Sequence, residues 1–390
     1  MTNIQSKIDQ LISQHCPDGV EFLEVGKICQ VNRGRVMSKD YLRDNAWKYP
    51  VYSSQTSNDW IFGLIDTFDY DGEYVTWTTD WANAWSVFYR NGKFSITNVC
   101  GLLKPRDDDM LSVKYLSYIL GTVAKSYVNA GMGNPKIMSN VMEKIQIPIP
   151  PLPVQAEIVR ILDTFTELEA ELEAELEARK SQYEYYRDEL LSFEEDEVEW
   201  KTLKEMMGRN KWTQITAAEM RELDTQDWSV KIFAWWKTFA MVNFEDIPKK
   251  DIHNVPSIIV KSRWIIEFEY YDKPFSHKNE FRSYYSGNPK IDIKYVYYFL
   301  KINEPYFQTI ANRMQMPQIA LPDTDKFKIP IPYKNWQPDL EKQQEIVMTL
   351  GKFDALVNDI AIGLPAELQS RRQQYEYYRN KLLTFKPLVK

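Results

Sequence analysis

The residue types that most often carry enzyme chemistry are few in this chain and form no known catalytic constellation. His15, His253 and His277 are far apart, and no HExxH pair that would hold zinc occurs. Gly131-Met-Gly133 lacks the third glycine of a dinucleotide fingerprint, and there is no GxSxG nucleophile elbow. The Asn/Asp-Pro-Pro-aromatic motif of adenine methyltransferases is also missing. The sequence therefore predicts a non-enzyme with no catalytic residues, no metal site and no cofactor of its own.

Basic and polar residues gather instead in loops beside aromatic residues. Arginine can bind guanine through two hydrogen bonds, asparagine can bind adenine, and lysine, serine and threonine can meet phosphates. For any single one of them an ordinary solvated loop is the favoured explanation, so the prediction depends on two such loop sets in one chain. The candidate DNA contacts are Arg33, Arg35, Thr78, Thr79, Asp80, Asn83 and Lys136, then Lys211, Thr213, Lys237, Lys261, Ser262, Arg263 and Lys278.

The elements that would position these loops occur twice, because the chain is a tandem repeat. Three motifs of the first half recur in the same order in the second, which indicates a globular segment and a helix, each present in two copies. The matches are Ile147–Pro150 with Ile329–Pro332, Gln155–Phe165 with Gln343–Phe353, and Arg179–Phe193 with Arg371–Phe385.

The repeated motifs indicate long spacer helices. Apolar residues from Val154 onward recur with a mean step of 3.6, which is helical and predicts about 39 residues, or roughly 58 Å. In the second copy Gly363-Leu-Pro365 predicts a break, followed by a helix to about Phe385. The predicted packing residues are Ile158, Phe165, Leu168, Leu172, Leu176, Tyr183, Tyr186, Phe353, Leu356, Tyr375 and Tyr378.

A single amphipathic helix of this length needs a partner for its apolar stripe. Its own copy is the expected partner, in an antiparallel coiled-coil pair with pseudo-twofold symmetry. The alternative is that each helix packs only on its own globular domain.

The globular segments mix strands with helices, so the predicted fold class is α+β, with two globular domains of mixed α/β content joined by the two helical spacers. Asn91-Gly92 predicts a hairpin turn between two strands. The other predicted elements are strands at 74–78, 86–89, 94–97 and 257–260 and helices at 113–123 and 291–300. The predicted domains are 1–147, the central spacer 148–197, the second globular domain 198–328, and the distal spacer 329–390.

The formal net charge of −7 argues at first against a DNA-binding protein. Its location changes that conclusion, because residues 166–199 hold 14 acids and 3 bases, whereas residues 200–334 hold 21 bases and 16 acids. Three cysteines cannot form a disulfide framework, and neither a secretory signal nor an apolar run of membrane-spanning length is visible. A cytoplasmic protein is therefore expected.

The duplicated Gln-x-Glu-Ile-Val and Tyr-Glu-Tyr-Tyr-Arg-x-x-Leu-Leu-x-Phe motifs resemble those of the specificity (S) subunits of type I restriction–modification enzymes. The resemblance covers nearly the whole chain. It implies that each globular domain is a target recognition domain reading one half of a bipartite site in double-stranded DNA. It also implies that the spacers dock two methyltransferase subunits, and that two restriction/motor subunits join the full complex. Those partners would bind S-adenosylmethionine, ATP and Mg²⁺.

The resemblance also gives a meaning to Thr166–Ala178, which contains three tetrads of the type x-Glu-Leu-Glu. In the family, tetrad number here sets the gap between the half-sites. The main alternative function is a duplicated coiled-coil scaffold that binds no specific DNA sequence. A truncated or recombined S variant that assembles without methylating is a third possibility.

Tryptophan stands where family-like strings carry glycine. The positions are Trp81, Trp85, Trp235, Trp236 and Trp264, in a chain with only 14 glycines and 12 tryptophans. Either these indoles stack at DNA, or the chain is altered and its recognition impaired.

Overall fold

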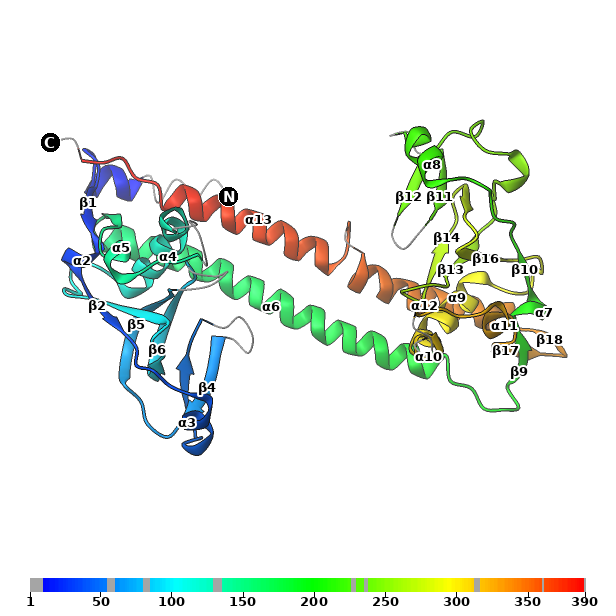
Figure 1. Cartoon of the computed structure of the whole chain (residues 1–390), viewed down its shortest axis with the longest axis horizontal. Coiled ribbons are helices and arrows are strands. Elements are labelled where there is room, and N and C mark those ends of the chain that lie inside the picture. Colours follow the sequence, from blue (N-terminus) through cyan, green and yellow to red (C-terminus); the bar gives the residue numbers. More distant parts are fainter. Residues whose placement is uncertain are drawn as a thin grey trace. The chain divides into compact units, whose positions relative to one another are not determined.

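The computed structural model describes residues 10–54, 60–79, 85–128, 135–225, 229–234, 238–311, 316–359 and 361–388. The chain divides into two compact units (Figure 1). Unit 1 is Met1–Glu173 with Glu367–Lys390, and unit 2 is Ala174–Ala366. Each unit therefore combines a globular segment with helical segments that come from both copies of the repeat.

Unit 1 is built on a six-stranded sheet of order β2-β7-β5-β6-β3-β4 and a separate pair, β1 with β8. Helix α4 packs against β5 and β6. The strands are β1 (Glu21–Glu24), β2 (Cys29–Arg33), β3 (Tyr49–Tyr52), β4 (Ile61–Ile65), β5 (Tyr70–Thr78), β6 (Val87–Ile96), β7 (Cys100–Pro105) and β8 (Gln146–Ile149). The helices are α2 (Val25–Ile28), α3 (Lys39–Asp44), α4 (Val113–Val123) and α5 (Ser139–Met142), with a 3₁₀ turn at Ala124–Tyr127.

The hairpin predicted at Asn91-Gly92 is wrong. Strand β6 runs through these residues and pairs with β5 without interruption, from Tyr70 opposite Phe94 to Trp77 opposite Val87. The pairing of Gly72 with Gly92 accommodates the local distortion, since their φ angles are 120° and 96°. A long partner strand therefore overrides the local turn preference. The predicted strand at 74–78 and the helix at 113–123 are confirmed.

Unit 2 contains a four-stranded sheet, β10-β16-β13-β14, and two three-stranded sheets, β12-β11-β15 and β18-β17-β9. The strands are β9 (Val198–Thr202), β10 (Met207–Arg209), β11 (Val230–Phe233), β12 (Phe239–Val242), β13 (Ser257–Lys261), β14 (Glu267–Tyr271), β15 (Phe275–His277), β16 (Phe281–Ser286), β17 (Lys328–Lys334) and β18 (Gln337–Pro338). The helices are α7 (Leu203–Met206), α8 (Ala217–Leu223), α9 (Ile293–Ile302), α10 (Glu304–Ala311) and α11 (Leu321–Asp325), with a 3₁₀ turn at Lys249–Asp251.

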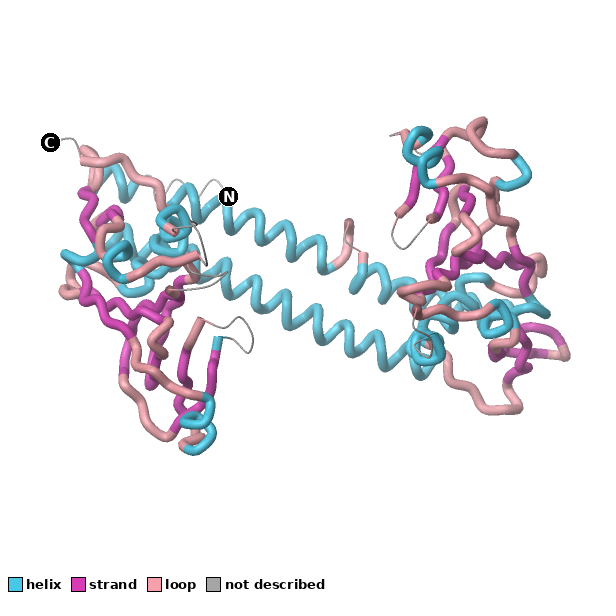
Figure 2. The backbone as a smooth tube through the Cα atoms, viewed as in Figure 1, coloured by secondary structure: helices cyan, strands magenta, loops and turns pink. Residues whose placement is uncertain are grey.

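The first spacer is one helix, α6 (Leu152–Leu190), of 39 residues, as its periodicity predicted. The second spacer is divided into α12 (Leu340–Asn358) and α13 (Leu364–Leu382), with the predicted Gly-Leu-Pro string at the start of α13 (Figure 2). The first part of α6 belongs to unit 1 together with α13, and its last part belongs to unit 2 together with α12.

Within each unit the helices meet through the same aromatic contact. In unit 1 the ring of Phe165 stacks on Tyr378, with centroids 5.5 Å apart and planes at 23°. In unit 2 Phe353 stacks on Tyr186 at 5.5 Å and 24°. Phe353 is the repeat copy of Phe165, and Tyr378 is the repeat copy of Tyr186. Each contact therefore joins the start of the spacer in one copy to the end of the spacer in the other copy. The prediction that the helix pairs with its own copy is confirmed.

The direction of the pair in unit 1 follows from its ion pairs. Arg372 of α13 binds Glu169 through Nε, 2.6 Å from Oε1, and also binds Glu173 through Nη2. Contacts that advance along α6 from Phe165 to Glu173 move backwards along α13 from Tyr378 to Arg372, so the helices are antiparallel.

The other predicted packing residues differ in their burial. Ile158 is fully buried in the core of unit 1, and Leu172 and Leu176 are half-buried. Leu168 and Leu356 remain exposed, and on α12 the neighbouring Val357 is buried instead. The predicted stripe is therefore off by one position at Leu356, because an apolar pattern does not fix the rotation of a helix to within one residue.

A buried glutamine fastens the start of each spacer helix to its globular domain. Gln155 Oε1 accepts a hydrogen bond from the backbone N–H of Ser112 at 2.9 Å, and its Nε2 donates to the carbonyls of Met110 and Pro150. Gln343 Oε1 accepts from the N–H of Asp292, also at 2.9 Å. The repeated Gln therefore joins the helix to the loop before α4 or α9.

The Ile-Pro-Ile-Pro motifs form the strands just before these glutamines. Strand β8 pairs with β1, and β17 pairs with β9, both antiparallel. The hydroxyl of Tyr115 donates to the Pro148 carbonyl at 3.1 Å, and that of Tyr295 donates to the Pro330 carbonyl at 2.6 Å. The two units thus repeat both their sequence motifs and the contacts that these motifs make.

Replacing Gln155 with alanine is expected to lower the free energy of unfolding by about 2–3 kcal/mol, because buried backbone groups lose their partners. Chemical denaturation of the full chain measures this. Gln373→Ala on the exposed side of α13 is the matched control. A loss no larger than that of the control would contradict the anchoring role of Gln155.

Candidate nucleic-acid interface

The candidate contacts of unit 1 gather where β2 and β5 end and β7 begins. Arg33, the last residue of β2, donates from Nη2 to the carbonyl of Asn98 at 2.5 Å and lies 3.4 Å from Thr79 Oγ1. The backbone carbonyl of Thr79 accepts from the N–H of Ile137, which places Lys136 beside the same cluster. Arg33, Thr79 and the segment of Lys136, which are distant in sequence, therefore come together.

The two threonines of this cluster are interior residues. Thr78 and Thr79 are 1% and 0% exposed. Thr78 Oγ1 accepts from the N–H of Ser86, and Thr79 Oγ1 donates to the carbonyl of Val99 at 3.0 Å. They shape the loop around Arg33, and direct contact of their side chains with DNA stays a prediction.

Two further candidates of unit 1 are on the surface. Arg35 is exposed, pairs with Asp69 at 3.1 Å and lies over the ring of Tyr41. Lys136 is exposed as well. Asp80 and Asn83 lie outside the described residues.

Arg90 of β6 is a residue that the sequence reasoning missed. Its guanidinium carbon is 3.6 Å from the centroid of the Tyr52 ring and 4.6 Å from that of Phe88. Burial lowers the pKa of this guanidinium. In the sequence, Arg90 looked like part of a hairpin turn, and only the continuous strand places it among aromatic rings.

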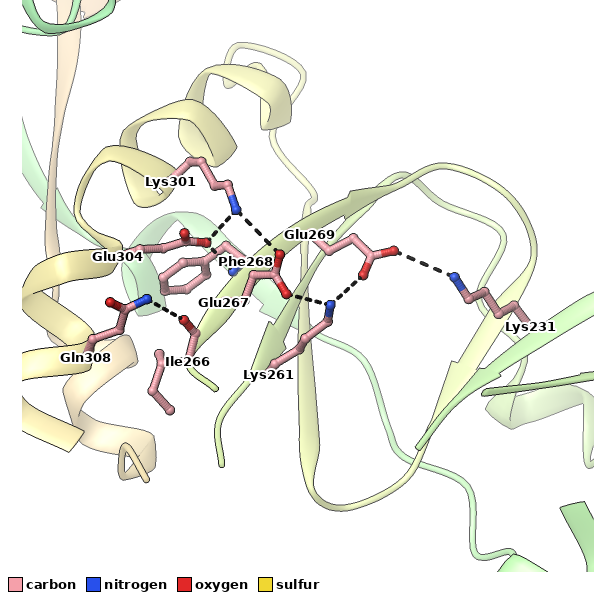
Figure 3. A network of polar contacts seen from close by, with 9 residues as sticks. All are labelled: Lys231, Lys261, Ile266, Glu267, Phe268, Glu269, Lys301, Glu304 and Gln308. Carbon is pink, nitrogen blue, oxygen red and sulfur yellow. Dashed lines mark hydrogen bonds and ion pairs between the residues drawn. The ribbon is translucent and has the colours of Figure 1, made fainter. Parts of the chain in front are cut away.

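Lys261 of unit 2 belongs to an internal network of charges (Figure 3). Its Nζ lies 2.8 Å from Glu267 and 3.1 Å from Glu269, and Lys301 and Lys231 extend the network. Burial alone would lower the pKa of Lys261, but the hydrogen bond to Glu267 and the charges of both glutamates raise it overall. Lys261 is thus charged but already neutralised, which makes it a poor phosphate ligand.

Three other segments of unit 2 meet around the turn between β15 and β16. The N–H of Thr213 donates to the carbonyl of His277, and Ser262 Oγ donates to the carbonyl of Glu280 at 2.8 Å. Thr213 and Ser262 are 1% and 4% exposed, so they join loops in the interior of this cluster. Lys278 lies within this turn, 4.0 Å from Glu280.

The exposed candidates of unit 2 are Lys211 and Arg263. Each adjoins one of the buried connectors, Thr213 or Ser262, so the connectors hold their loops in place. Lys237 lies outside the described residues. Direct DNA contact stays a prediction for every candidate residue, and the surface positions of Lys211 and Arg263 make them the strongest in this unit.

His277 is buried inside the same cluster. One ring nitrogen, Nδ1, is 2.9 Å from the carbonyl of Lys278, whereas Nε2 is buried without a hydrogen-bond partner. Burial lowers the pKa of His277 to about 4. A neutral imidazole with Nδ1 as donor fits this environment.

No group of three or more residues suited to hold a metal ion occurs in the part of the chain that the structure describes. None of the described helices is both long enough and apolar enough to span a membrane.

Comparison with known proteins identifies the family. Residues 17–178 and 222–370 match the model of the type I restriction modification DNA specificity domain. The chain is 31% identical over 364 residues to a Mycoplasma pneumoniae protein named as a type I specificity subunit, covering 92% of this chain and 96% of that protein. A second protein of that organism, named as the N-terminus of such a subunit, is 46% identical over 181 residues, or 44% of this chain and 96% of that protein.

Solved structures share the fold. The S subunit of the type I restriction–modification system of M. genitalium has a TM-score of 0.64 at 16% identity, covering 94% of this chain and 96% of that chain. A chain from a study of complex assembly in the type I R–M system has a TM-score of 0.57 at 10% identity, covering 94% and 97%. The chain belongs to the type I restriction–modification DNA specificity family.

The lowered pKa of His277 predicts that acid destabilises the chain. Between about pH 6.5 and pH 4 the unfolded imidazole binds a proton that the folded one does not, so stability is complete above pH 6.5 and falls as the pH is lowered. The loss can reach about 3 kcal/mol. Urea denaturation across this range is expected to show a flatter pH dependence for His277→Phe than for the parent chain. Equal slopes for His277→Phe and the parent chain would contradict a buried neutral imidazole.

Proposed function

We propose that each unit reads one half of a bipartite DNA target, and that the paired helices fix the distance between the two reading surfaces. The duplicated anchoring contact at Gln155 and Gln343 is the observation that carries the proposal. It attaches a stiff helix in the same way to both recognition domains, as a spacer between two readers requires. Membership of the DNA specificity family supports the reading function.

The chemistry in this proposal belongs to partner subunits. Two methyltransferase subunits dock on the spacer helices and supply S-adenosylmethionine, and two restriction/motor subunits supply ATP- and Mg²⁺-dependent cleavage. The chain itself contributes no cofactor and no catalytic residue, and it acts in the cytoplasm. The modest excess of bases in residues 200–334 fits a reader that gains part of its affinity for phosphates from its partners.

Replacing one candidate arginine in each unit, the half-buried Arg33 in unit 1 and the exposed Arg263 in unit 2, tests the two-reader arrangement. Arg33→Ala is expected to weaken discrimination at one half-site, and Arg263→Ala at the other, each roughly tenfold or more because a bidentate base contact is lost. Competition binding with the S–methyltransferase complex and duplexes mutated in one half-site measures this. Lys27→Ala and Lys204→Ala, at exposed lysines of α2 and α7, are the matched controls.

The same experiment separates the proposal from a scaffold without sequence preference. If the parent complex bound scrambled and cognate duplexes equally, the reading function would be lost and the scaffold favoured. If both arginine variants affected one half-site, the assignment of one half-site to each unit would be wrong.

Adding one Glu-Leu-Glu-Ala tetrad after Ala174 is expected to lengthen the unspecified gap of the DNA target by about one base pair. A tetrad adds about 6 Å of helix, which covers one whole step of 3.4 Å along DNA but falls slightly short of two. Methylome sequencing of cells that carry the lengthened gene and its partner genes reads the gap directly. An insertion of the same length in the exposed loop at Phe244 is the control, and an unchanged gap in the tetrad variant would refute the spacer role.

A further inference from the structure

Three tryptophans of the described chain have a backbone conformation that favours glycine. Trp60, Trp264 and Trp336 have φ angles of 66°, 67° and 65°. In this left-handed region the Cβ atom of an L residue crowds a carbonyl oxygen, and a bulky residue is an outlier there. Among the described non-glycine residues only Asn335 shares the region, and asparagine tolerates it well.

The turn between β17 and β18 shows which residue type position 336 requires. Lys334 pairs with Gln337, so Asn335 and Trp336 form a two-residue hairpin loop. Both have positive φ, as in a type I′ turn, whose preferred sequence is Asn-Gly. The side chain of Trp336 is 95% exposed, so packing does not compensate for the conformation.

Two other tryptophans behave as that residue type should. Trp77 is fully buried, and its Nε1 donates to the carbonyl of Ile137 at 3.1 Å. Trp200 lies in β9 and packs edge-on against Phe299, with centroids 6.3 Å apart. Neither has a positive φ. The described tryptophans therefore include two kinds, one with an ordinary backbone conformation and one with a conformation that favours glycine.

The amino-acid composition is also low in glycine and rich in tryptophan. The chain has 14 glycines in 390 residues, about half of the usual share of roughly 7%, beside 12 tryptophans. Glycine positions occupied by tryptophan account for part of both departures. Trp264 also follows Ser262-Arg263, where the family-like string is Ser-Arg-Gly.

We propose that Trp60, Trp264 and Trp336 occupy glycine positions of the working protein, and that the cell of origin reads their codons as glycine. The codon that permits this is UGA, which is a stop in the standard code and is decoded as tryptophan or as glycine in different bacterial codes. One base separates UGA from the glycine codon GGA. The same proposal requires UGG at Trp77 and Trp200.

Glycine at position 264 would change the loop of unit 2 that is proposed to read DNA, and this step rests on the proposed function. Trp264 is 47% exposed beside Arg263 in a loop whose backbone is held by the bond from its N–H to the carbonyl of Pro317, at 2.7 Å. Glycine at 264 removes a bulky side chain next to Arg263 and lets the backbone approach a phosphate closely. The reading loop of unit 2 is then Ser-Arg-Gly.

Peptide mass spectrometry of the protein isolated from its own cells tests the assignment without reference to function. The peptides that contain residues 60, 264 and 336 are expected to have the mass of glycine at these positions, and those that contain Trp77 and Trp200 the mass of tryptophan. The gene should have UGA at the first three codons and UGG at the last two. Tryptophan mass at position 264 or 336, or UGG there, overturns the proposal.

Recombinant variants give a second, independent readout. Trp336→Gly is expected to raise the melting temperature of the full chain, because it relieves the strained turn and removes no buried contact. The matched control Trp200→Gly is expected to lower it. A lower melting temperature for Trp336→Gly would contradict the assignment at that turn.

Binding of the S–methyltransferase complex to DNA then tests separately whether glycine at position 264 favours DNA reading. Trp264→Gly is expected to bind a cognate duplex more tightly than the Trp264 form. Weaker binding by Trp264→Gly would instead identify the indole as a DNA contact and overturn this step, while the mass result would still decide the codon assignment.

Discussion

The attachment of each spacer helix through a buried glutamine is the constraint on which the rest of this protein depends. A recognition domain fused to a helix by a flexible joint could point its loops in any direction, and the helix would then measure nothing. Gln155 and Gln343 remove that freedom, because each binds backbone groups of the globular domain from the first turns of the helix. The hydroxyl bonds of Tyr115 and Tyr295 to the preceding strands add a second fixed point.

The aromatic pairs then connect the two copies of the repeat. Phe165 with Tyr378 and Phe353 with Tyr186 are the same contact made twice, each time between different copies. Residues 386–388 also join the two halves of the sequence. The N–H of Val20 donates to the carbonyl of Lys386, and the carbonyl of Val20 accepts from the N–H of Leu388. Each unit is therefore complete only when both halves of the sequence are present.

The periodic features of the fold were readable from the sequence, and the features set by tertiary contacts were not. The length of α6 and the Gly-Leu-Pro string at the start of α13 follow from local rules that do not depend on distant residues. Asn91-Gly92 failed as a turn signal because β5 supplies a partner along the whole of β6. Thr79 is a candidate DNA contact by residue type, but sequence cannot show that its hydroxyl donates to the Val99 carbonyl. Lys261 looked like a free cation for a similar reason, because its glutamate partners act only once β13 and β14 pair.

The ion pairs of Arg372 show how such a protein can evolve. Its two partners, Glu169 and Glu173, are four residues apart, which is the period of the tetrads themselves. Gain or loss of a whole tetrad therefore brings chemically equivalent glutamates to the same places along the helix. A lineage can in this way try a different target length in a single genetic event, without waiting for a compensating change in the opposing helix.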